Sequence, residues 1–193
     1  MAPKQKITKE QIEEGAFAYV RERGAEALKA RDLSQYLHCS TQPIFSNFSG
    51  MGEVRQAVIL QAARLCDQYL KSEENEPNAY IAMGLGYLRF AYQEKNLFRL
   101  LFLGCREEVE SVSADRPDQR AKEVLTKIAG VTEDDAYLTH IEMWVAVHGI
   151  ATMLCTGYVG WDNDLIRKLL KDIYDCLETR FGFKKKQAED TTV

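Results

Sequence analysis

The stretch LKARDLSQYLHCSTQPIFSNF, residues 28–48, decides the fold of this chain, because it reads as two short helices joined by a sharp turn. The leucines of its first half share one side of a helix, and His38-Cys39 interrupts that pattern. Ser40 is suited to N-cap a second helix, and Pro43 falls in that helix's first turn, where a missing N–H costs little. The stretch therefore predicts a helix, a turn and a second, shorter helix.

The second of these helices has an apolar back and a polar front. Ile44 and Phe48 stand four residues apart and share a face, whereas Gln42 and Ser46 lie roughly opposite them at about 100° per residue. A short helix with these two faces is suited to the major groove of DNA, where a glutamine can read adenine. An ordinary surface helix would carry the same residues, so that alternative stays open at this point.

The composition is that of an ordinary globular protein. Of the 193 residues, 46% are hydrophobic and 28% are charged, and no uninterrupted apolar run reaches the roughly 18 residues that a membrane span needs. The first residues, MAPKQKITKEQ, lack the apolar core of a secretory signal. We therefore expect a cytoplasmic protein that does not enter a membrane.

The formal net charge of −4 is unevenly spread along the chain. Residues 1–55 carry eight Lys and Arg against seven Asp and Glu, a balance of +1, and the remaining residues carry 17 against 22, a balance of −5. This small asymmetry permits a DNA-facing module on an acidic body. Five scattered cysteines without a C-x-x-C pair predict reduced thiols and favour neither a disulfide framework nor a zinc site.

One helix is expected before the opening stretch and a long one after it. Thr8 and Gln11 form a T-x-x-Q capping box, and Gly24 ends the helix that they begin. Beyond Gly50, an apolar stripe predicts a long fourth helix over about residues 53–72. Together these elements predict a compact three-helix unit with a connecting rod.

Residues 7–61 resemble the TetR-type (TetR/AcrR) bacterial transcriptional regulators. The resemblance rests on the first helix with its late Gly24 and on the block RDLSQYLHCSTQPIFSNFSGMGEV, which is similar to that family's helix-turn-helix and the start of its fourth helix. Two residues depart from the family. Phe45 stands where members usually have Tyr, whose hydroxyl reaches a DNA phosphate, and Met51 stands where they usually have Lys. The resemblance implies an all-α dimer that binds DNA with fewer phosphate contacts than is usual.

Within this interpretation, side chains of the second short helix divide between bases and phosphates. Gln42 and Ser46 are expected at base edges, while Thr41 and Asn47 are expected at phosphates, which position a protein without specifying sequence. The full set of residues expected to bind DNA is Thr41, Gln42, Phe45, Ser46 and Asn47, with Lys6 and Arg31 before them.

The second half of the chain reads as a helical bundle that follows a polar joint, residues 72–78. Its first apolar stripe contains Gly84 and Gly86, which each cost a helix about 1 kcal/mol relative to Ala and therefore predict close packing or local pliability. The helices expected after the joint cover about residues 80–91, 96–105, 120–128, 133–155 and 164–181.

A second and shorter resemblance lies in the segment MWVAVHGIATM. Its Trp144, His148 and Gly149 are similar to a W-x-x-x-H-G element in the effector domains of many TetR-type proteins. In those proteins the last two long helices form the dimer interface. The apolar stripe of the last helix supplies the interface residues expected here, which are Leu169, Ile173 and Leu177.

Aromatic residues and methionines of the second half would suit a pocket for a small apolar effector, although they could equally form a core. His140 and His148 stand about 12 Å apart along a helix, too far to chelate one metal. For His148, a place in the core or an interface is the simpler interpretation, and a polar contact to a ligand is the alternative. The expected pocket residues are Met83, Tyr87, Phe90, Phe98, Phe102, Trp144, His148 and Met153.

These observations predict an all-α protein of about nine helices. Residues 1–50 are expected to form a helix-turn-helix DNA-binding domain, and the fourth helix, residues 52–73, connects it to a ligand-binding and dimerisation domain over residues 74–185. The expected function is transcriptional regulation by a homodimer, usually a repressor, which a small apolar effector releases from a pseudo-palindromic operator in double-stranded DNA.

We expect no cofactor, metal or catalytic residue, because no phosphate loop, nucleophile elbow or paired-acid motif is visible. Two other classes of function stay open from the sequence alone. One is an enzyme that uses the helical cavity, and the other is an interaction module with an incidental helix-turn-helix.

Overall fold

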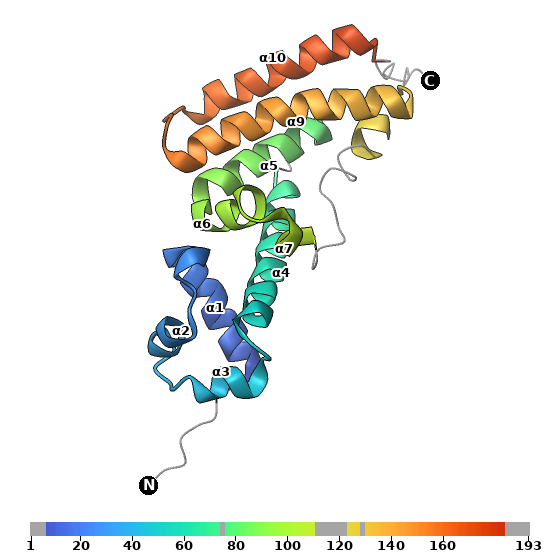
Figure 1. The fold of residues 1–193 in the computed structure, drawn as a ribbon. Helices are drawn as coiled ribbons and strands as arrows, with labels where there is room; N and C mark the ends of the chain where they lie inside the picture. The colour runs from blue at the N-terminus through green and yellow to red at the C-terminus, as the bar shows by residue number, and fades with distance from the viewer. Residues whose placement is uncertain (1–6, 74–75, 111–122, 128–129, 184–193) are drawn as a thin grey trace, which may run out of the picture. The chain divides into compact units, whose positions relative to one another are not determined.

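A computed structural model describes residues 7–73, 76–110, 123–127 and 130–183 (Figure 1). All regular secondary structure in these residues is helical, which confirms the predicted all-α class.

The chain divides into two compact units. The first comprises Met1–Gln68 and Gln93–Ala114, and the second comprises Tyr69–Tyr92 and Asp115–Val193. The division therefore groups a later segment with the N-terminal helices, whereas the functional domains expected from the sequence are contiguous. Those functional boundaries stay a prediction.

The first unit begins with the helices of the predicted helix-turn-helix region. They are α1 (Lys9–Arg23), α2 (Ala30–Tyr36), α3 (Gln42–Asn47) and α4 (Met51–Leu70), with a 3₁₀ turn at Ala25–Ala27 and the last two residues of α4 in the second unit. The later segment adds α6 (Lys95–Phe98), a π-helical turn (Arg99–Leu103) and α7 (Arg106–Glu110).

The capping box at the start of α1 is confirmed. Thr8 Oγ1 accepts from the backbone N–H of Gln11 at 3.2 Å, and Gln11 Oε1 accepts from the backbone N–H of Thr8 at 2.9 Å. Gly24 follows the last residue of α1 with a φ of 86°, a conformation that favours glycine. Local signals therefore set both ends of this helix.

A close contact between α1 and α2 fixes the helix-turn-helix core. A Cβ built on Gly15 would lie 2.2 Å from Leu37 Cδ2, so α2 packs where α1 has no side chain. Leu33, Ile44 and Phe48 are buried beneath α2 and α3. The apolar faces predicted for both short helices therefore point into one core.

The turn between α2 and α3 is made by His38 in the left-handed region, with a φ of 52°. The His38 N–H donates to the carbonyl of Gln35, and the Cys39 N–H donates to the carbonyl of Ser34. This pattern ends a helix by satisfying its last carbonyls. The expectation that Ser40 caps α3 is wrong, because Thr41 is the N-cap residue and its side chain makes no capping bond.

The later segment is joined to α1 by an ion pair between a buried carboxylate and a half-exposed arginine. Glu94 is 4% exposed, and Arg21 holds both of its carboxylate oxygens, through Nε at 2.6 Å and through Nη2. Asn96 Nδ2 donates to the carbonyls of Arg21 and Glu22, two of the last carbonyls of α1. The C-terminal end of α1 and the start of α6 therefore form one structural element.

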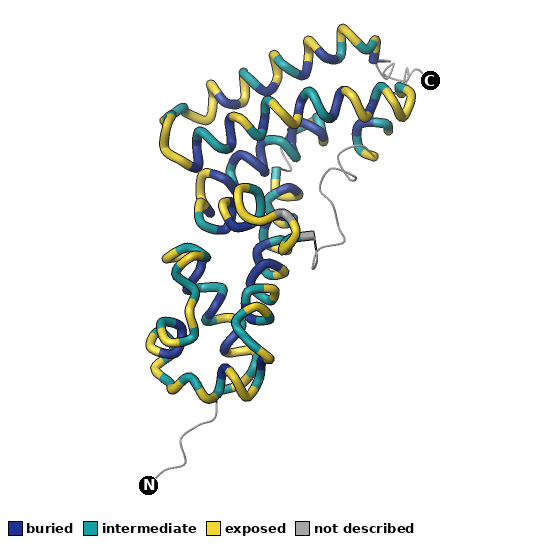
Figure 2. Tube along the Cα trace, in the orientation of Figure 1, coloured by how far each residue is buried: buried dark blue, intermediate teal, exposed yellow. Residues whose placement is uncertain are grey.

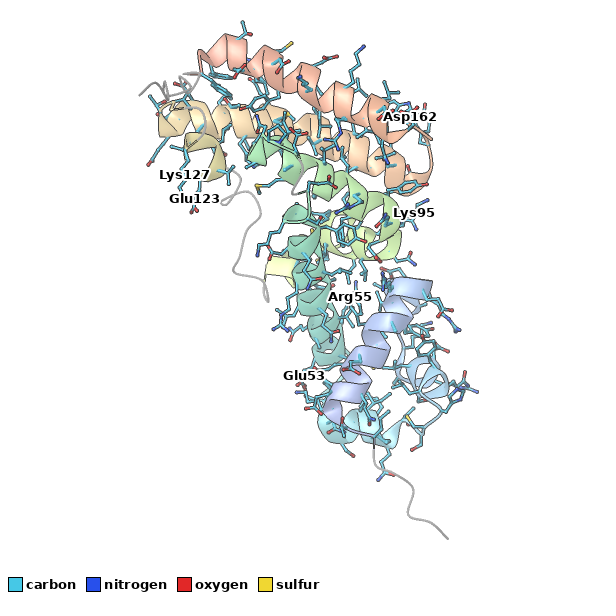
Figure 3. The ribbon with its side chains drawn as sticks, turned by 180° about the vertical axis from the view of Figure 1, so that it is seen from behind. Glu53, Arg55, Lys95, Glu123, Lys127 and Asp162 are labelled. Carbon is cyan, nitrogen blue, oxygen red and sulfur yellow. The ribbon has the colours of Figure 1, made fainter. Side chains whose placement is uncertain are left out.

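The second unit consists of α5 (Ala79–Gln93), a helical segment at residues 123–127, α9 (Glu133–Thr156) and α10 (Asn163–Phe181). Figure 1 shows α9 and α10 lying side by side, with α5 along α9. Thr132 caps α9, and Asp162, labelled in Figure 3, caps α10 by accepting from the Leu165 N–H at 2.8 Å.

The prediction of close packing at the glycines of α5 is confirmed. A Cβ on Gly86 would lie 2.1 Å from the carbonyl oxygen of Tyr69, because the end of α4 packs backbone to backbone against α5 there. A Cβ on Gly84 would lie 3.0 Å from Leu170 Cδ2, the far end of a side chain of α10.

By length and composition alone, α9 is apolar enough to cross a membrane, although none of its uninterrupted apolar runs reaches roughly 18 residues. Only 44% of its apolar window is buried within the chain. Core helices of soluble proteins meet the same two criteria, so this feature does not by itself indicate a membrane protein.

Candidate nucleic-acid interface

The helix α3 has one anchored face and one exposed face (Figure 2). Ile44 is fully buried and Phe48 is 4% exposed, which fixes the orientation of the helix. Gln42 and Ser46 are exposed, and the Phe45 side chain is exposed over 56% of its surface. The structure therefore places these three expected DNA-binding residues together on the free face of α3.

The other expected residues lie around this face. Thr41 and Asn47 are half-buried at the two ends of α3, and Arg31 is exposed on α2. Lys6 lies outside the described residues.

Two polar side chains of α3 bond to their own helix. Ser46 Oγ donates to the carbonyl of Gln42 at 2.9 Å, and Asn47 Nδ2 donates to the carbonyl of Pro43 at 2.8 Å. Each bond reaches one turn back and orients the side chain along the helix. A hydroxyl and an amide oriented in this way keep acceptor capacity, and the amide keeps a second N–H.

The start of α4 is tied to α1 by Glu53, whose position is labelled in Figure 3. Its carboxylate accepts from the Ser49 N–H at 2.8 Å, from Ser49 Oγ at 3.1 Å and from Lys9 Nζ at 3.1 Å. The bond from the Ser49 backbone, followed by that from Lys9, lowers the pKa of Glu53. Lys9 also lies 4.9 Å from the centre of the Phe48 ring, so this cluster holds the α3–α4 turn in place.

Of the residues expected in an effector pocket, three come together between α5 and α9. The Tyr87 hydroxyl and His148 Nδ1 are 2.9 Å apart, and the Trp144 ring stacks on the His148 ring with centroids 5.0 Å apart. Burial lowers the pKa of His148, which favours its neutral form. The polar partner of His148 Nδ1 is therefore the Tyr87 hydroxyl of the same chain.

The remaining pocket residues are distributed over both units. Met83 and Met153 are half-buried in the second unit, where Phe90 is fully buried against the Tyr69 ring. Phe98 and Phe102 belong to the first unit, where their rings contact each other. A shallow depression lined by Phe17, Ala18, Arg21 and Glu22 lies on α1, and none of the expected pocket residues lines it.

A second tyrosine–histidine pair lies about two turns away along the same two helices. The Tyr80 hydroxyl and His140 Nδ1 are 2.9 Å apart, both residues are buried, and burial raises the pKa of Tyr80. The two pairs fix the register of α5 against α9. Helical periodicity predicts an apolar face for each of these helices, but it carries no signal that these side chains form hydrogen bonds.

The expected dimer residues differ in exposure. Leu169 and Ile173 are half-buried on α10, whereas Leu177 is 8% exposed and already packed within its own chain. Leu177 is therefore not available to a second copy without rearrangement, while Leu169 and Ile173 are.

The fold and this site define an all-α protein that combines a helix-turn-helix unit with a helical bundle. Residues 80–177, just over half of the chain, match the family model described as the tetracyclin repressor-like C-terminal domain. The chain therefore belongs to the tetracycline repressor-like family of transcriptional regulators, whose members are soluble and are generally DNA-binding repressors. No curated protein matches the chain.

Proposed function

We propose that this chain binds a specific operator in double-stranded DNA through α3 and regulates transcription, usually by repression. The main supporting observation is the orientation of α3. Ile44 and Phe48 anchor its back in the core, so Gln42, Phe45 and Ser46 are turned outward on one face. Membership of a family of regulators supports the same conclusion and disfavours an enzyme.

In this proposal the side chains of α3 have separate tasks. Gln42 reads a base edge, since a glutamine amide can pair with the N6 and N7 groups of adenine. Ser46 lies one turn further along the same exposed face and contacts the neighbouring base edge. Thr41 and Asn47 at the ends of the helix, with Arg31 on α2, hold phosphates and fix the register.

The proposed active form is a homodimer that uses the half-buried Leu169 and Ile173 of α10. A two-fold dimer presents two copies of α3, separated by about 34 Å or a multiple of it to meet successive turns of one DNA face. The operator is then pseudo-palindromic, because its symmetry mirrors that of the protein.

Replacing Gln42 by alanine is expected to weaken binding to the operator by about 1–3 kcal/mol per half-site while leaving binding to random duplex nearly unchanged. The reason is that an amide reading a base contributes only where the right base is present. Fluorescence anisotropy with both duplexes at one salt concentration measures this difference. Gln68→Ala, at an exposed position of α4, is the matched control. Equal losses on both duplexes would exclude base reading by Gln42.

Replacing Phe45 by tyrosine is expected to strengthen binding to every duplex by about three- to tenfold, because the exposed ring gains a donor for a phosphate. A neutral hydroxyl releases no counterion, so the slope of log affinity against log salt stays unchanged. Met51→Lys, at the start of α4, adds a cation and should steepen that slope by about 0.9 for each phosphate contacted. Weaker binding by Phe45→Tyr would place this ring away from the DNA backbone.

We further propose that a small apolar effector binds in the second unit and lowers operator affinity. Tyr87, Trp144 and His148 form a cluster of aromatic rings with few polar groups. Met83 on α5 and Met153 on α9 are half-buried, and their thioether groups would also suit a small apolar molecule. The helix α4 begins just after α3 in the first unit, and its last two residues belong to the second unit, so each unit contains part of this one helix.

The effector proposal requires a reciprocal coupling. If an effector weakens operator binding by a given factor, the operator must weaken effector binding by the same factor, typically five- to 150-fold. Titrating each member of a panel of small apolar molecules into the protein, with and without operator duplex, measures both affinities. A molecule that binds with the same affinity in both titrations is not an effector.

A further inference from the structure

The stretch that contains α3 carries no charge of its own. Residues 33–52, which include α3 and the turns on both sides of it, contain no Lys, Arg, Asp or Glu. Much of the affinity of a protein for DNA comes from cations that displace counterions from the phosphates. Cations that assist α3 therefore have to come from neighbouring elements of the first unit.

Lys9 is a cation at this end of the first unit for which α1 itself gives no reason. It is the first residue of α1, where the helix dipole disfavours a positive charge, and the cap of α1 is made by Thr8 and Gln11. Figure 1 shows the start of α1 beside α3 and the start of α4. The position of Lys9 is therefore explained by its neighbours in space.

Two contacts hold the ammonium group of Lys9 between α3 and α4. Its Nζ lies 3.1 Å from Oε1 of Glu53, which is in the first turn of α4. The same atom lies 4.9 Å from the centre of the ring of Phe48, which directly follows α3. The Lys9 side chain is still 43% exposed. A side chain that is already held in place loses less conformational freedom when it binds a partner, so Lys9 is prepared to meet an anion.

Glu53 leaves Lys9 able to bind an anion. Oε2 of Glu53 accepts from the N–H and the hydroxyl of Ser49, while Oε1 accepts from Lys9, so the carboxylate charge is shared among three donors. An ammonium group has three N–H donors, and the bond to Glu53 uses one of them. Lys9 can therefore donate to an anion and keep its contact with Glu53.

The next cation along α4 is engaged on another side of that helix. Arg55 Nε lies 2.7 Å from Glu108 Oε2 of α7, and Arg55 Nη1 donates to the carbonyl of Ala25 at 3.2 Å. Residues two apart on a helix point in nearly opposite directions, so Arg55 does not share the side of Glu53. Arg55 therefore serves contacts within the first unit, whereas Lys9 lies next to the end of α3.

We propose that Lys9 binds a phosphate of the DNA backbone beside α3 and that Glu53 and Phe48 position its ammonium group for this contact. This inference rests on the DNA binding proposed above and adds a residue of α1 to the contacts of α2 and α3. Met51, the first residue of α4, carries no charge, so Lys9 brings a cation to the start of α4 from another helix. A phosphate contact does not read sequence, so Lys9 contributes equally to every duplex.

Replacing Lys9 by glutamine tests the inference through the salt dependence of binding. Affinity for a random-sequence duplex and for the tightest genomic fragment should fall by the same factor, about fivefold at physiological salt for each copy bound. The slope of log affinity against log salt should become shallower by about 0.9 per copy. Lys9→Arg keeps the cation and should keep the slope. Lys95→Gln is the matched control, because Lys95 is exposed at the other end of the first unit from Glu53 (Figure 3) and should leave the slope unchanged.

The variant Glu53→Gln separates a phosphate contact from a purely structural ion pair. It removes the carboxylate but keeps the cation, so the slope should not become shallower. If the pair serves folding alone, Lys9→Gln and Glu53→Gln will lower the thermal melting temperature alike and leave the slope unchanged, which would overturn the inference. Lys9→Met keeps the apolar stem beside Phe48 and serves as a second neutral variant if Lys9→Gln does not fold.

The outcomes also separate this inference from the DNA-binding proposal on which it rests. A full chain that binds no duplex at low salt would overturn both. A full chain that binds DNA with a slope that Lys9→Gln leaves unchanged would overturn the role of Lys9 alone. A loss of affinity confined to the genomic fragment would do the same, because a phosphate contact acts on every sequence.

Discussion

Replacing Gly86 by alanine is expected to destabilise the second unit by about 3 kcal/mol or more. The added Cβ would lie 2.1 Å from the carbonyl oxygen of Tyr69, 2.8 Å from its carbonyl carbon and 3.0 Å from the Cα of Leu70. Backbone atoms of a helix cannot turn aside as a side chain can, so α4 and α5 must separate. That separation opens the surrounding core, and such overpacking outweighs the roughly 1 kcal/mol by which alanine favours a helix over glycine.

Urea unfolding at one fixed protein concentration measures this effect, because the stability of an oligomer depends on concentration. Gly84→Ala is the matched control on the same helix. Its Cβ would meet only Leu170 Cδ2, at 3.0 Å, and this methyl group can rotate away. The control should stay within about 1 kcal/mol of the unchanged protein. An unfolding midpoint for Gly86→Ala that matches that of the control would mean that α4 and α5 do not pack as described.

Replacing Ile173 by glutamate is expected to dissociate the proposed dimer and to lower operator affinity by a factor of about a hundred or more. A carboxylate in an apolar interface must be desolvated without a partner, which costs several kcal/mol in a two-fold interface that contains it twice. A monomer has one recognition helix, so it loses the gain of engaging two half-sites at once. Binding to random duplex should fall less steeply.

The matched control is Lys171→Gln, which changes the net charge of α10 by the same amount. Lys171 is exposed and lies roughly opposite Leu169 and Ile173 around the helix. Size-exclusion chromatography with light scattering should find monomers for Ile173→Glu and dimers for the control, while circular dichroism finds both fully helical. An Ile173→Glu protein that remains a dimer would move the interface away from α10.

The sequence predicted those elements whose ends carry local signals. The capping box of Thr8 and Gln11, the glycine after α1 and the Thr132 cap of α9 all lie within a few residues of the helix that they delimit. Such signals act through hydrogen bonds between near neighbours, so a single sequence contains them. The α3 cap was misplaced by one residue, because Ser40 and Thr41 are neighbours of residue types that both favour the N-cap position.

Contacts between residues far apart in the chain could not be predicted from the sequence. Periodicity gives the buried face of a helix but not its partner, so neither the Tyr87–His148 pair nor the hold of Arg21 on Glu94 could be predicted. Nothing in the sequence distinguishes Glu94 from the other charged residues, and its 4% exposure in the structure identifies it as part of the core. For the same reason the sequence separated segment 96–105 from the N-terminal helices with which it packs.

The candidate site divides in the same way. The free face of α3 follows from helical periodicity, and the structure places Gln42, Phe45 and Ser46 on it. The pocket residues were grouped by type, and the structure distributes them over two units because aromatic residues fill cores as readily as they line pockets. Leu177 was expected in the dimer interface because it lies on the apolar stripe of α10. The stripe alone does not show which of its residues pack within the chain and which stay exposed, and Leu177 is buried.

The most direct test of the central claim is to select genomic fragments that the full chain retains and to measure its affinity for the strongest one. The comparison duplex has the same composition in scrambled order, and both are titrated at physiological salt. We predict that the selected fragment contains a pseudo-palindrome, binds one dimer and is preferred by at least a thousandfold, as sequence-specific regulators require. Equal affinity for the two duplexes would contradict the proposal that this chain recognises an operator.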